Sequence, residues 1–341
     1  MGEPLLELPR IFAIVDYCHF LSNKIRKEIL PTFVCNGTLL TREIAQSLHD
    51  HGILFGISLD GLESEHNLNR IDVSGNGSYQ AVYNGLLSGS NPLMGIAITL
   101  TNTTSSFVAV YESFKDLCGA ISIKPVRFSP LDRKGYDIQF ITNRYNELYE
   151  YFVENIRKGD IKPLLTFLNG DDYFGKFIAR ILLNTPVLQR CDAGTARFFL
   201  GPDNLKHVCP AAYKTVLLNE SELPVLSAGC LRCLARFTCG GWCRVDYKNS
   251  SFNPQIENLC EINRHLYYLS IRLCSLLFFE FESIREKLYI FCQKKNNRYK
   301  KDLGLEMLLD CFPGRDFISL KKEYDSNGTS LLESLLDAKN E

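Results

Sequence analysis

The sequence lacks a signal peptide, a bilayer-length apolar run and an excess of charge of either sign. Its 341 residues carry 38 Lys and Arg against 39 Asp and Glu, which gives no reason to expect nucleic acid or an anionic membrane as a partner. Arg272, Ser275 and Glu280 interrupt the most apolar helical segment, 266–281, so it reads as buried core. These absences argue against a secreted or membrane-spanning protein and predict a cytoplasmic one.

A disulfide framework is also missing, because the thirteen cysteines are odd in number and no secretion signal accompanies them. Seven of them gather in one stretch: Cys191, Cys209, Cys230, Cys233, Cys239, Cys243 and Cys260. Four fall within fourteen residues and have the spacing CX2CX5CX3C. Thiolates this close in a chain of this kind indicate metal ligands.

The number of sulfurs bears on which metal they bind. Zinc sites usually combine two well-separated pairs of ligands, which would leave three of the seven cysteines without a role. Seven sulfurs fit two iron–sulfur clusters better, one with four ligands and one with three. The nearby Phe237, Gly240, Gly241 and Trp242 suit such a site, because glycines allow backbone amides to approach sulfurs and an apolar shell excludes water. The spacing favours iron–sulfur, with zinc as the alternative.

The order of these cysteines resembles the SPASM domain of radical S-adenosylmethionine (SAM) enzymes. That family modifies peptides and proteins and includes anaerobic sulfatase maturases. Asn204 stands at the usual turn glycine and tolerates the same left-handed conformation. The resemblance implies one auxiliary 4Fe–4S cluster on Cys230, Cys233, Cys239 and Cys260. It implies a second auxiliary 4Fe–4S cluster on Cys191, Cys209 and Cys243.

Residues 1–128 alternate short apolar strands with helical patterns, which predicts an α/β fold of parallel βα units. The predicted strands cover 29–35, 53–60, 94–101 and 120–128. The predicted helices cover 8–24, 40–51, 78–87 and 107–117, and Gly52 is expected to end the second of them. In such folds ligands gather at the carboxyl ends of the strands.

The loops at these strand ends resemble the second part of a radical SAM (β/α) barrel, with four of its six strands. The resemblance implies SAM contacts from Gly2, Glu3, Ser58, Asp60 and Arg70, although Met1 replaces the first glycine of the family's GGEP motif and Asn67 replaces a frequent aspartate. The assignment is chemically sensible, because a carboxylate suits the SAM ammonium and an arginine or hydroxyl suits its carboxylate. Without the family context, a surface ion pair of Arg70 with Glu63 or Glu65 is the more ordinary interpretation.

The CX3CX2C loop that holds the SAM-cleaving cluster in this family does not occur in the sequence. We therefore expect a truncated member that is inactive for SAM cleavage as given. In a complete member, 5′-deoxyadenosyl-radical chemistry modifies a peptide or protein side chain. The alternatives are a non-catalytic iron–sulfur protein that transfers electrons or binds peptides, and a gene fragment or misplaced start.

Four regions are expected: the partial barrel (1–128), a helical connection (129–188), the SPASM domain (189–262) and a C-terminal helical region (263–341). In the connection, 143–158 and 171–184 have amphipathic helical patterns. Segment 261–294 reads as one long or broken helix. The charged tail from residue 296 receives no function.

Two further residues are candidates beside the cluster ligands. Sulfatase maturases place a general-base aspartate after the second cysteine of the series, where this chain has Pro210. Asp192 is a candidate base instead, although a cap or turn role is more ordinary. His207, water or a substrate thiolate could complete the Cys191 cluster. The expected partners are a peptide or protein substrate and a leader-peptide-binding partner protein.

Overall fold

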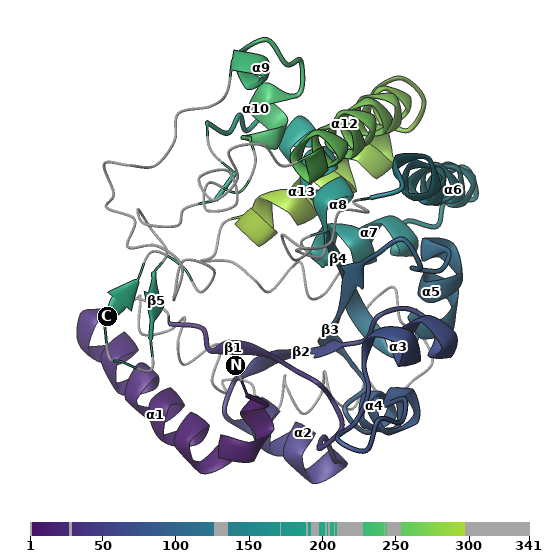
Figure 1. Cartoon of the computed structure of the whole chain (residues 1–341). Coiled ribbons are helices and arrows are strands. Elements are labelled where there is room, and N and C mark those ends of the chain that lie inside the picture. Colours follow the sequence, from purple (N-terminus) through teal and green to yellow (C-terminus); the bar gives the residue numbers. More distant parts are fainter. Residues whose placement is uncertain are drawn as a thin grey trace.

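The structure is a computed structural model (Figure 1). It describes residues 2–26, 29–125, 136–170, 172–188, 190–191, 198–201, 203, 205–207, 209, 228–241, 243 and 254–296. Asp192, Asn204, Pro210 and Trp242 lie outside the described residues, as does the tail from 297 onward.

A four-stranded sheet organises the first third of the chain. Its strands are β1 (Thr32–Cys35), β2 (Leu54–Ser58), β3 (Asn91–Leu100) and β4 (Cys118–Pro125). They lie in the order β1-β2-β3-β4, and every neighbouring pair is parallel. A parallel pair needs a crossover connection, and a helix supplies each one. The predicted α/β class and all four predicted strands are confirmed, with ends that differ by up to three residues.

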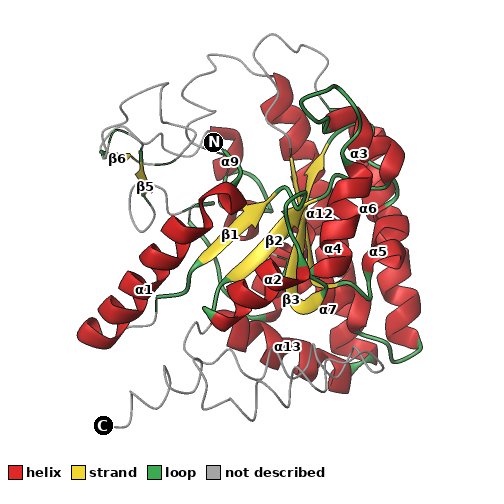
Figure 2. Ribbon diagram, turned by 90° about the horizontal axis from the view of Figure 1, so that it is seen from below, coloured by secondary structure: helices red, strands yellow, loops and turns green. Residues whose placement is uncertain are grey.

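Helices follow the strands around the outside of the sheet (Figures 1 and 2). They are α1 (Leu8–Ile25), α2 (Arg42–Asp50), α3 (Glu63–Asn69), α4 (Tyr79–Ser88) and α5 (Phe107–Phe114), with a 3-10 turn η1 (Pro4–Glu7) before α1. Thr41 begins α2 by accepting the Ile44 N–H at 3.3 Å. Gly52 follows it with φ +66°, so the predicted glycine stop is confirmed.

The two faces of the sheet carry different side chains. One face carries large apolar side chains, which are buried under the helices. In the β2–β3–β4 register, Ile57, Ile96 and Ile121 lie side by side on this face. The other face carries small residues that stay partly exposed, including Gly56, Gly95 and Ala97. Alternate residues of a strand point to opposite faces, so this division follows directly from the sequence of β2 and β3.

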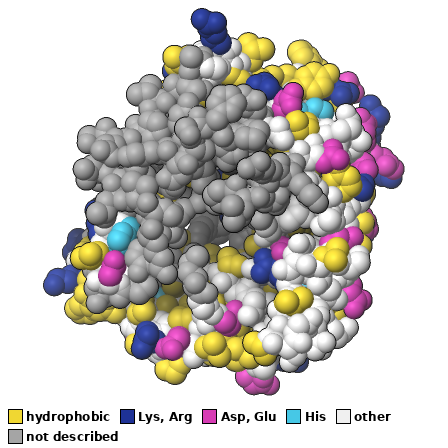
Figure 3. Space-filling view, in the orientation of Figure 1, with side chains coloured by type: hydrophobic (Ala, Val, Ile, Leu, Met, Phe, Trp, Pro, Cys, Tyr) yellow, Lys and Arg dark blue, Asp and Glu magenta, His cyan; other side chains and the backbone are white. Residues whose placement is uncertain are grey.

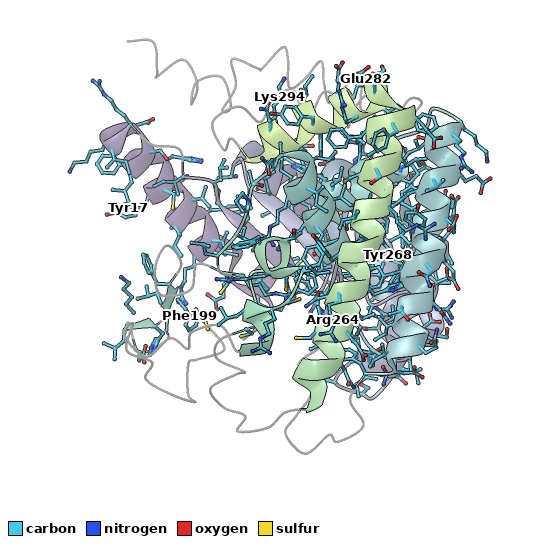
Figure 4. The ribbon with its side chains drawn as sticks, turned by 90° about the horizontal axis from the view of Figure 1, so that it is seen from above. Tyr17, Phe199, Arg264, Tyr268, Glu282 and Lys294 are labelled. Carbon is cyan, nitrogen blue, oxygen red and sulfur yellow. The ribbon has the colours of Figure 1, made fainter. Side chains whose placement is uncertain are left out.

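The remaining long helices form a second layer. They are α6 (Ile138–Arg157), α7 (Lys162–Asn169), α8 (Tyr173–Leu182), α12 (Pro254–Glu280) and α13 (Glu282–Asn296). Helix α12 packs along α6 and α8 (Figure 4). The long C-terminal pattern is indeed broken, at Phe281, and α7 had no counterpart among the predicted helices. Among the described residues, no helix is both long enough and apolar enough for a bilayer crossing.

Short elements carry the cysteine-rich region. They are the antiparallel pair β5 (Phe199–Leu200) and β6 (Lys206–His207), and the helices α9 (Ala228–Leu231) and α10 (Arg236–Cys239). Helix α10 contacts both α8 and α12. It ends at Gly240 and Gly241, whose φ angles of +73° and +87° favour glycine. The region is thereby attached to the helical layer.

Candidate functional site

Glu3 connects the start of the chain to the carboxyl end of β1. Its Oε1 accepts the Leu5 N–H at 3.0 Å and so caps the 3-10 turn, while its Oε2 accepts the Asn36 N–H at 2.7 Å. Asn36 is the first residue after β1. A carboxylate has about four lone-pair positions, so two backbone contacts leave it able to accept from a further cation. Gly2 beside it is exposed.

Asp60 and Arg70 form a clamp beyond the ends of β2 and β3. Arg70 Nε donates to Asp60 Oδ2 at 2.6 Å and Nη2 to Oδ1 at 3.3 Å, and the Thr99 backbone N–H donates to Oδ1 at 2.7 Å. The Asp60 side chain is 5% exposed and that of Arg70 is 31% exposed. Arg70 therefore pairs with Asp60 rather than with Glu63 or Glu65. Two-point contact fixes the guanidinium, while its remaining exposure leaves it accessible to a ligand.

A buried histidine supports the Asp60–Arg70 pair through hydrogen bonds to neighbouring residues. His66 is fully buried, and its Nδ1 accepts the Asp60 backbone N–H at 3.2 Å, so the proton lies on Nε2. Nε2 is 3.0 Å from Ser78 Oγ, which in turn donates to the Arg70 carbonyl at 3.1 Å. Burial, aided by the charge of Arg70, lowers the His66 pKa and favours the neutral ring that these contacts require.

The small-residue face of the sheet lies next to this clamp. Ser58, Ala97 and Ser122 form one row of the register, and Gly56, Gly95 and Ala120 form the row before it. The Ser58 hydroxyl makes no hydrogen bond within the part of the chain that the structure describes. The Ser122 hydroxyl is buried and likewise has no partner among those residues. Small side chains and two hydroxyls suit a face that receives a polar ligand.

The structure therefore places Gly2, Glu3, Ser58, Asp60 and Arg70 along the carboxyl edge of three adjacent strands. Their role in SAM binding stays a prediction. Thr99, His66 and Ser122 received no role from the sequence. The burial of His66 on a short polar helix depends on how that helix folds back, for which the sequence carries no signal. Ser122 could have been found, because it is the one hydroxyl in the apolar run of β4.

Four cysteines approach one another between α9, α10 and the start of α12: Cys230, Cys233, Cys239 and Cys260. Burial, followed by the charges of Cys230, Cys239 and Cys233, raises the pKa of Cys260 to about 11. Burial and the charges of Cys230 and Cys233 also raise the pKa of Cys239, against the lowering effect of Arg190. These are the four cysteines that the sequence assigns to one cluster.

The kind and number of these side chains bear on which metal group they can hold. No group of three or more His, Cys, Asp or Glu among the described residues has the geometry for a metal ion. A 4Fe–4S cluster binds each thiolate through a different iron, so its ligands stand further apart than the ligands of one zinc ion. Four thiols are the donor set of a 4Fe–4S cluster, with one thiolate on each iron, and equally the donor set of a tetrahedral zinc site.

Two arginines connect the four-cysteine site to α8. Arg180 Nη1 on α8 donates to the Thr238 carbonyl at 2.5 Å. Arg190 Nη1 donates to Cys239 Sγ at 3.8 Å and to the Gly241 carbonyl at 3.3 Å, and its guanidinium stacks on the Tyr173 ring at 4.1 Å. Both contacts anchor α10, which carries the third cysteine, against the helical layer.

The other predicted ligands are less fully defined. Cys191, Cys209 and Cys243 are partly exposed, and their role as ligands of a second cluster stays a prediction. The Nε2 of His207 lies 3.0 Å from Asp203 Oδ2. Because the carboxylate engages Nε2, a metal contact from His207 would have to come from Nδ1. The predicted base Asp192 lies outside the described residues.

No protein-family model matches the chain. An uncharacterized protein of Methanocaldococcus jannaschii is 28% identical over 179 residues. The match covers 50% of this chain and 61% of that protein, so it spans about three fifths of the relative's length.

Solved structures of anSMEcpe, an anaerobic sulfatase-maturing enzyme, superimpose over most of the chain. Native anSMEcpe with bound AdoMet matches with a TM-score of 0.60 at 19% identity, covering 81% of this chain and 84% of that one. The complex with AdoMet and the Cp18Cys peptide gives 0.62 at 19% identity with the same coverage, and the Kp18Cys complex gives 0.60 at 20%. The chain thus has the fold of anSMEcpe across about four fifths of its length.

Proposed function

We propose that this chain is a radical SAM/SPASM protein of the class that modifies peptide or protein side chains. The observation that carries the proposal is the approach of Cys230, Cys233, Cys239 and Cys260 to one another in a chain with the fold of anSMEcpe. The family resemblance assigns these four cysteines to one cluster, and their electrostatic influence on one another supports that assignment. In this proposal they bind one auxiliary 4Fe–4S cluster, and Cys191, Cys209 and Cys243 bind a second.

SAM would bind along the carboxyl edge of the sheet. Glu3 would accept the SAM ammonium, and Arg70 and Ser58 would hold its carboxylate. Asp60 keeps the Arg70 guanidinium in place through the 2.6 Å contact. Glu3 is held at both of its oxygens by backbone N–H groups. Such a site is preorganised, because its charged groups are already fixed before the ligand arrives.

The peptide or protein substrate would occupy the small-residue face of the sheet. The anSMEcpe structures with bound AdoMet and Cp18Cys or Kp18Cys peptide support this choice of substrate class. Gly56, Gly95 and Ala97 leave room above the strands, and the hydroxyls of Ser58 and Ser122 can bond a backbone or ribose group. Whether Asp192 takes a proton from the substrate stays a prediction.

When bound, SAM and its reduced cluster supply a 5′-deoxyadenosyl radical for hydrogen abstraction, and auxiliary clusters accept an electron or anchor the substrate. The CX3CX2C loop for the SAM-cleaving cluster is not among these 341 residues. The proposal therefore assigns to this chain the SAM contacts, the substrate face and the auxiliary clusters. It assigns reductive cleavage of SAM only in combination with a CX3CX2C segment.

The test combines two measurements on anaerobically purified and reconstituted protein. Iron and zinc are counted per chain, and SAM binding is measured by isothermal titration calorimetry with the wild type and with Glu3→Gln. The expected results are about eight irons per chain and binding that weakens at least tenfold in E3Q.

Zinc in place of iron would overturn the cluster assignment. Eight irons without SAM binding would favour the non-catalytic iron–sulfur protein that transfers electrons or binds peptides. A SAM-cleavage assay on the same preparation tests the expectation of no turnover for the chain as given.

A further inference from the structure

We infer that Arg190 tunes the reduction potential of the four-cysteine cluster by donating to the sulfur of Cys239 while the Tyr173 ring holds its guanidinium. This inference rests on the proposed function, because it requires a cluster on Cys230, Cys233, Cys239 and Cys260. In it Arg190 is a positioning residue that acts through a cluster ligand and does not touch the substrate.

The geometry places a fixed cation against one ligand sulfur. Nη1 of Arg190 lies 3.8 Å from Cys239 Sγ, within reach for a hydrogen bond to sulfur, and 3.3 Å from the Gly241 carbonyl. The planar guanidinium stacks on Tyr173 at 4.1 Å. Tyr173 begins α8, whose own Arg180 holds the neighbouring Thr238 carbonyl. The cation is therefore supported from the helical layer and does not depend on the cysteine loop alone.

The electrostatic consequence has a definite sign. A 4Fe–4S cluster with four thiolates is an anion, and its one-electron reduction adds a further negative charge. A cation and a hydrogen bond at a ligand sulfur stabilise the reduced form more than the oxidised form, which raises the potential. Arg190 and Cys239 are both partly buried, so the charge of Arg190 acts there more strongly than an exposed charge would.

Other arginines near the site differ in this respect. Arg232 lies between Cys230 and Cys233 in sequence, but it is exposed. Arg264 acts on the charge of Cys260 from an exposed position on α12 (Figure 4). Solvent screens both of these cations. Arg232 is accordingly a suitable control, because its loss removes the same charge next to two ligands of the same cluster, but from a solvent-exposed position.

The experiment is an EPR-monitored redox titration of the full chain under anaerobic conditions. A Cys209→Ser/Cys243→Ser background removes the second cluster and leaves Cys191 next to Arg190 intact. Iron is counted first. About four irons in the background protein mean that the proposed function stands, and none means that the proposed function itself fails before Arg190 is tested.

On that background we expect Arg190→Gln to lower the midpoint potential by the equivalent of at least a tenfold change in the oxidised-to-reduced ratio, about 59 mV for one electron. Arg190→Lys keeps the charge but loses the planar stacking, so its shift should be smaller. Arg232→Gln should leave the potential unchanged. Equal potentials for R190Q and R232Q, with four irons in each, would overturn the inference.

A second variant covers the case in which R190Q fails to retain its iron. Tyr173→Leu keeps the guanidinium but removes the ring that holds it, so the potential should fall in the same direction by less. A Y173L protein with full iron and the wild-type potential would also overturn the inference, because the support of the cation would then have no effect on the cluster.

Discussion

The sheet edge and the four-cysteine site differ in how their charges are balanced. At the sheet edge the charges are already paired: Asp60 receives Arg70 at 2.6 Å and the Thr99 N–H at 2.7 Å. At the four-cysteine site the four side chains would carry like charge as thiolates, and burial, followed by the charges of neighbouring cysteines, raises the pKa of Cys260 to about 11. The first region is complete as protein. The second becomes favourable when a cationic iron core binds the thiolates.

This difference predicts how the two regions depend on what they bind. The sheet edge should keep its structure with or without SAM, as expected of a preorganised site. The four-cysteine site should gain order and stability from its cluster, because metal binding contributes folding free energy where like charges meet. The surface offers little contrast between the regions, since acidic and basic side chains are interspersed over the described part of the face in Figure 3.

The largest expected effect is on the cluster. Cys239→Ala should remove about four irons per chain, half of the total, and leave SAM affinity unchanged, because the two sites lie on different elements. Iron analysis and calorimetry on the same preparation measure both. Cys118→Ala is the control, since burial raises the pKa of Cys118 to about 12 and its thiol donates to the Phe114 carbonyl at 3.6 Å, away from the four-cysteine site. A C239A protein with full iron would contradict the ligand assignment.

The next effect is on the stability of the sheet edge. Asp60→Ala strands the Arg70 guanidinium and the Thr99 N–H, and should lower the free energy of unfolding by about 2–3 kcal/mol. Urea denaturation followed by circular dichroism gives the value. Glu154→Ala removes a solvent-exposed ion pair with Lys158, 2.6 Å long, and should cost less than about 0.5 kcal/mol. Equal losses of unfolding free energy in the two variants would show that the Asp60–Arg70 pair stabilises the protein no more than an exposed ion pair does.

A smaller effect is expected on ligand affinity when the small-residue face of the sheet is filled. Ala97→Leu places a large side chain on the small-residue face beside Ser58 and Ser122. It should weaken SAM or peptide binding about tenfold, or ~1.4 kcal/mol, without changing the iron content. Ala81→Leu on the exposed side of α4 is the matched control. Unchanged binding in A97L would place the ligand elsewhere.

The smallest expected effect is on the pH dependence of stability, through the buried carboxyl group of Asp172. Asp172 caps α8 by accepting the Phe174 N–H at 2.8 Å, and burial raises its pKa from 3.8 to about 6. The folded protein therefore binds this proton more tightly than the unfolded chain, and Asp172 makes the protein more stable as pH falls from about 6 toward 4.

Asp172→Asn keeps an oxygen acceptor for the cap and removes the titration. Its stability at pH 7.5 should equal or exceed that of the wild type, and the wild-type gain between pH 6 and 4 should shrink. Thermal unfolding across this pH range, compared between the two proteins, measures the difference. Identical pH profiles would mean that Asp172 is not ionised at neutral pH or is not buried as described.

Much of this molecule could be predicted where the signal is local. The strands of the sheet have continuous apolar sequences, and helices such as α2 have a cap and a glycine stop, so both were found. Helix α7 was missed because it spans only eight residues, too few for a helical period to stand out in the sequence. Three of the four approaching cysteines lie within ten residues, and the family resemblance supplied Cys260.

What could not be predicted depends on contacts between distant segments. Arg70 was weighed against its sequence neighbours Glu63 and Glu65, yet it pairs with Asp60 because the α3 helix brings the chain back over the end of β2. Arg190 reaches Gly241 and Cys239, about fifty residues away, through a turn that no local pattern encodes. Propensity and spacing specify elements and ligands, whereas tertiary packing decides which charges meet.

Mössbauer spectroscopy of the chain reconstituted with ⁵⁷Fe under anaerobic conditions tests the central claim most directly. Our account predicts the quadrupole doublets of two 4Fe–4S clusters, with the loss of one set in the Cys239→Ala protein. A spectrum without cluster iron, from a protein that instead retains zinc or no metal, would contradict it.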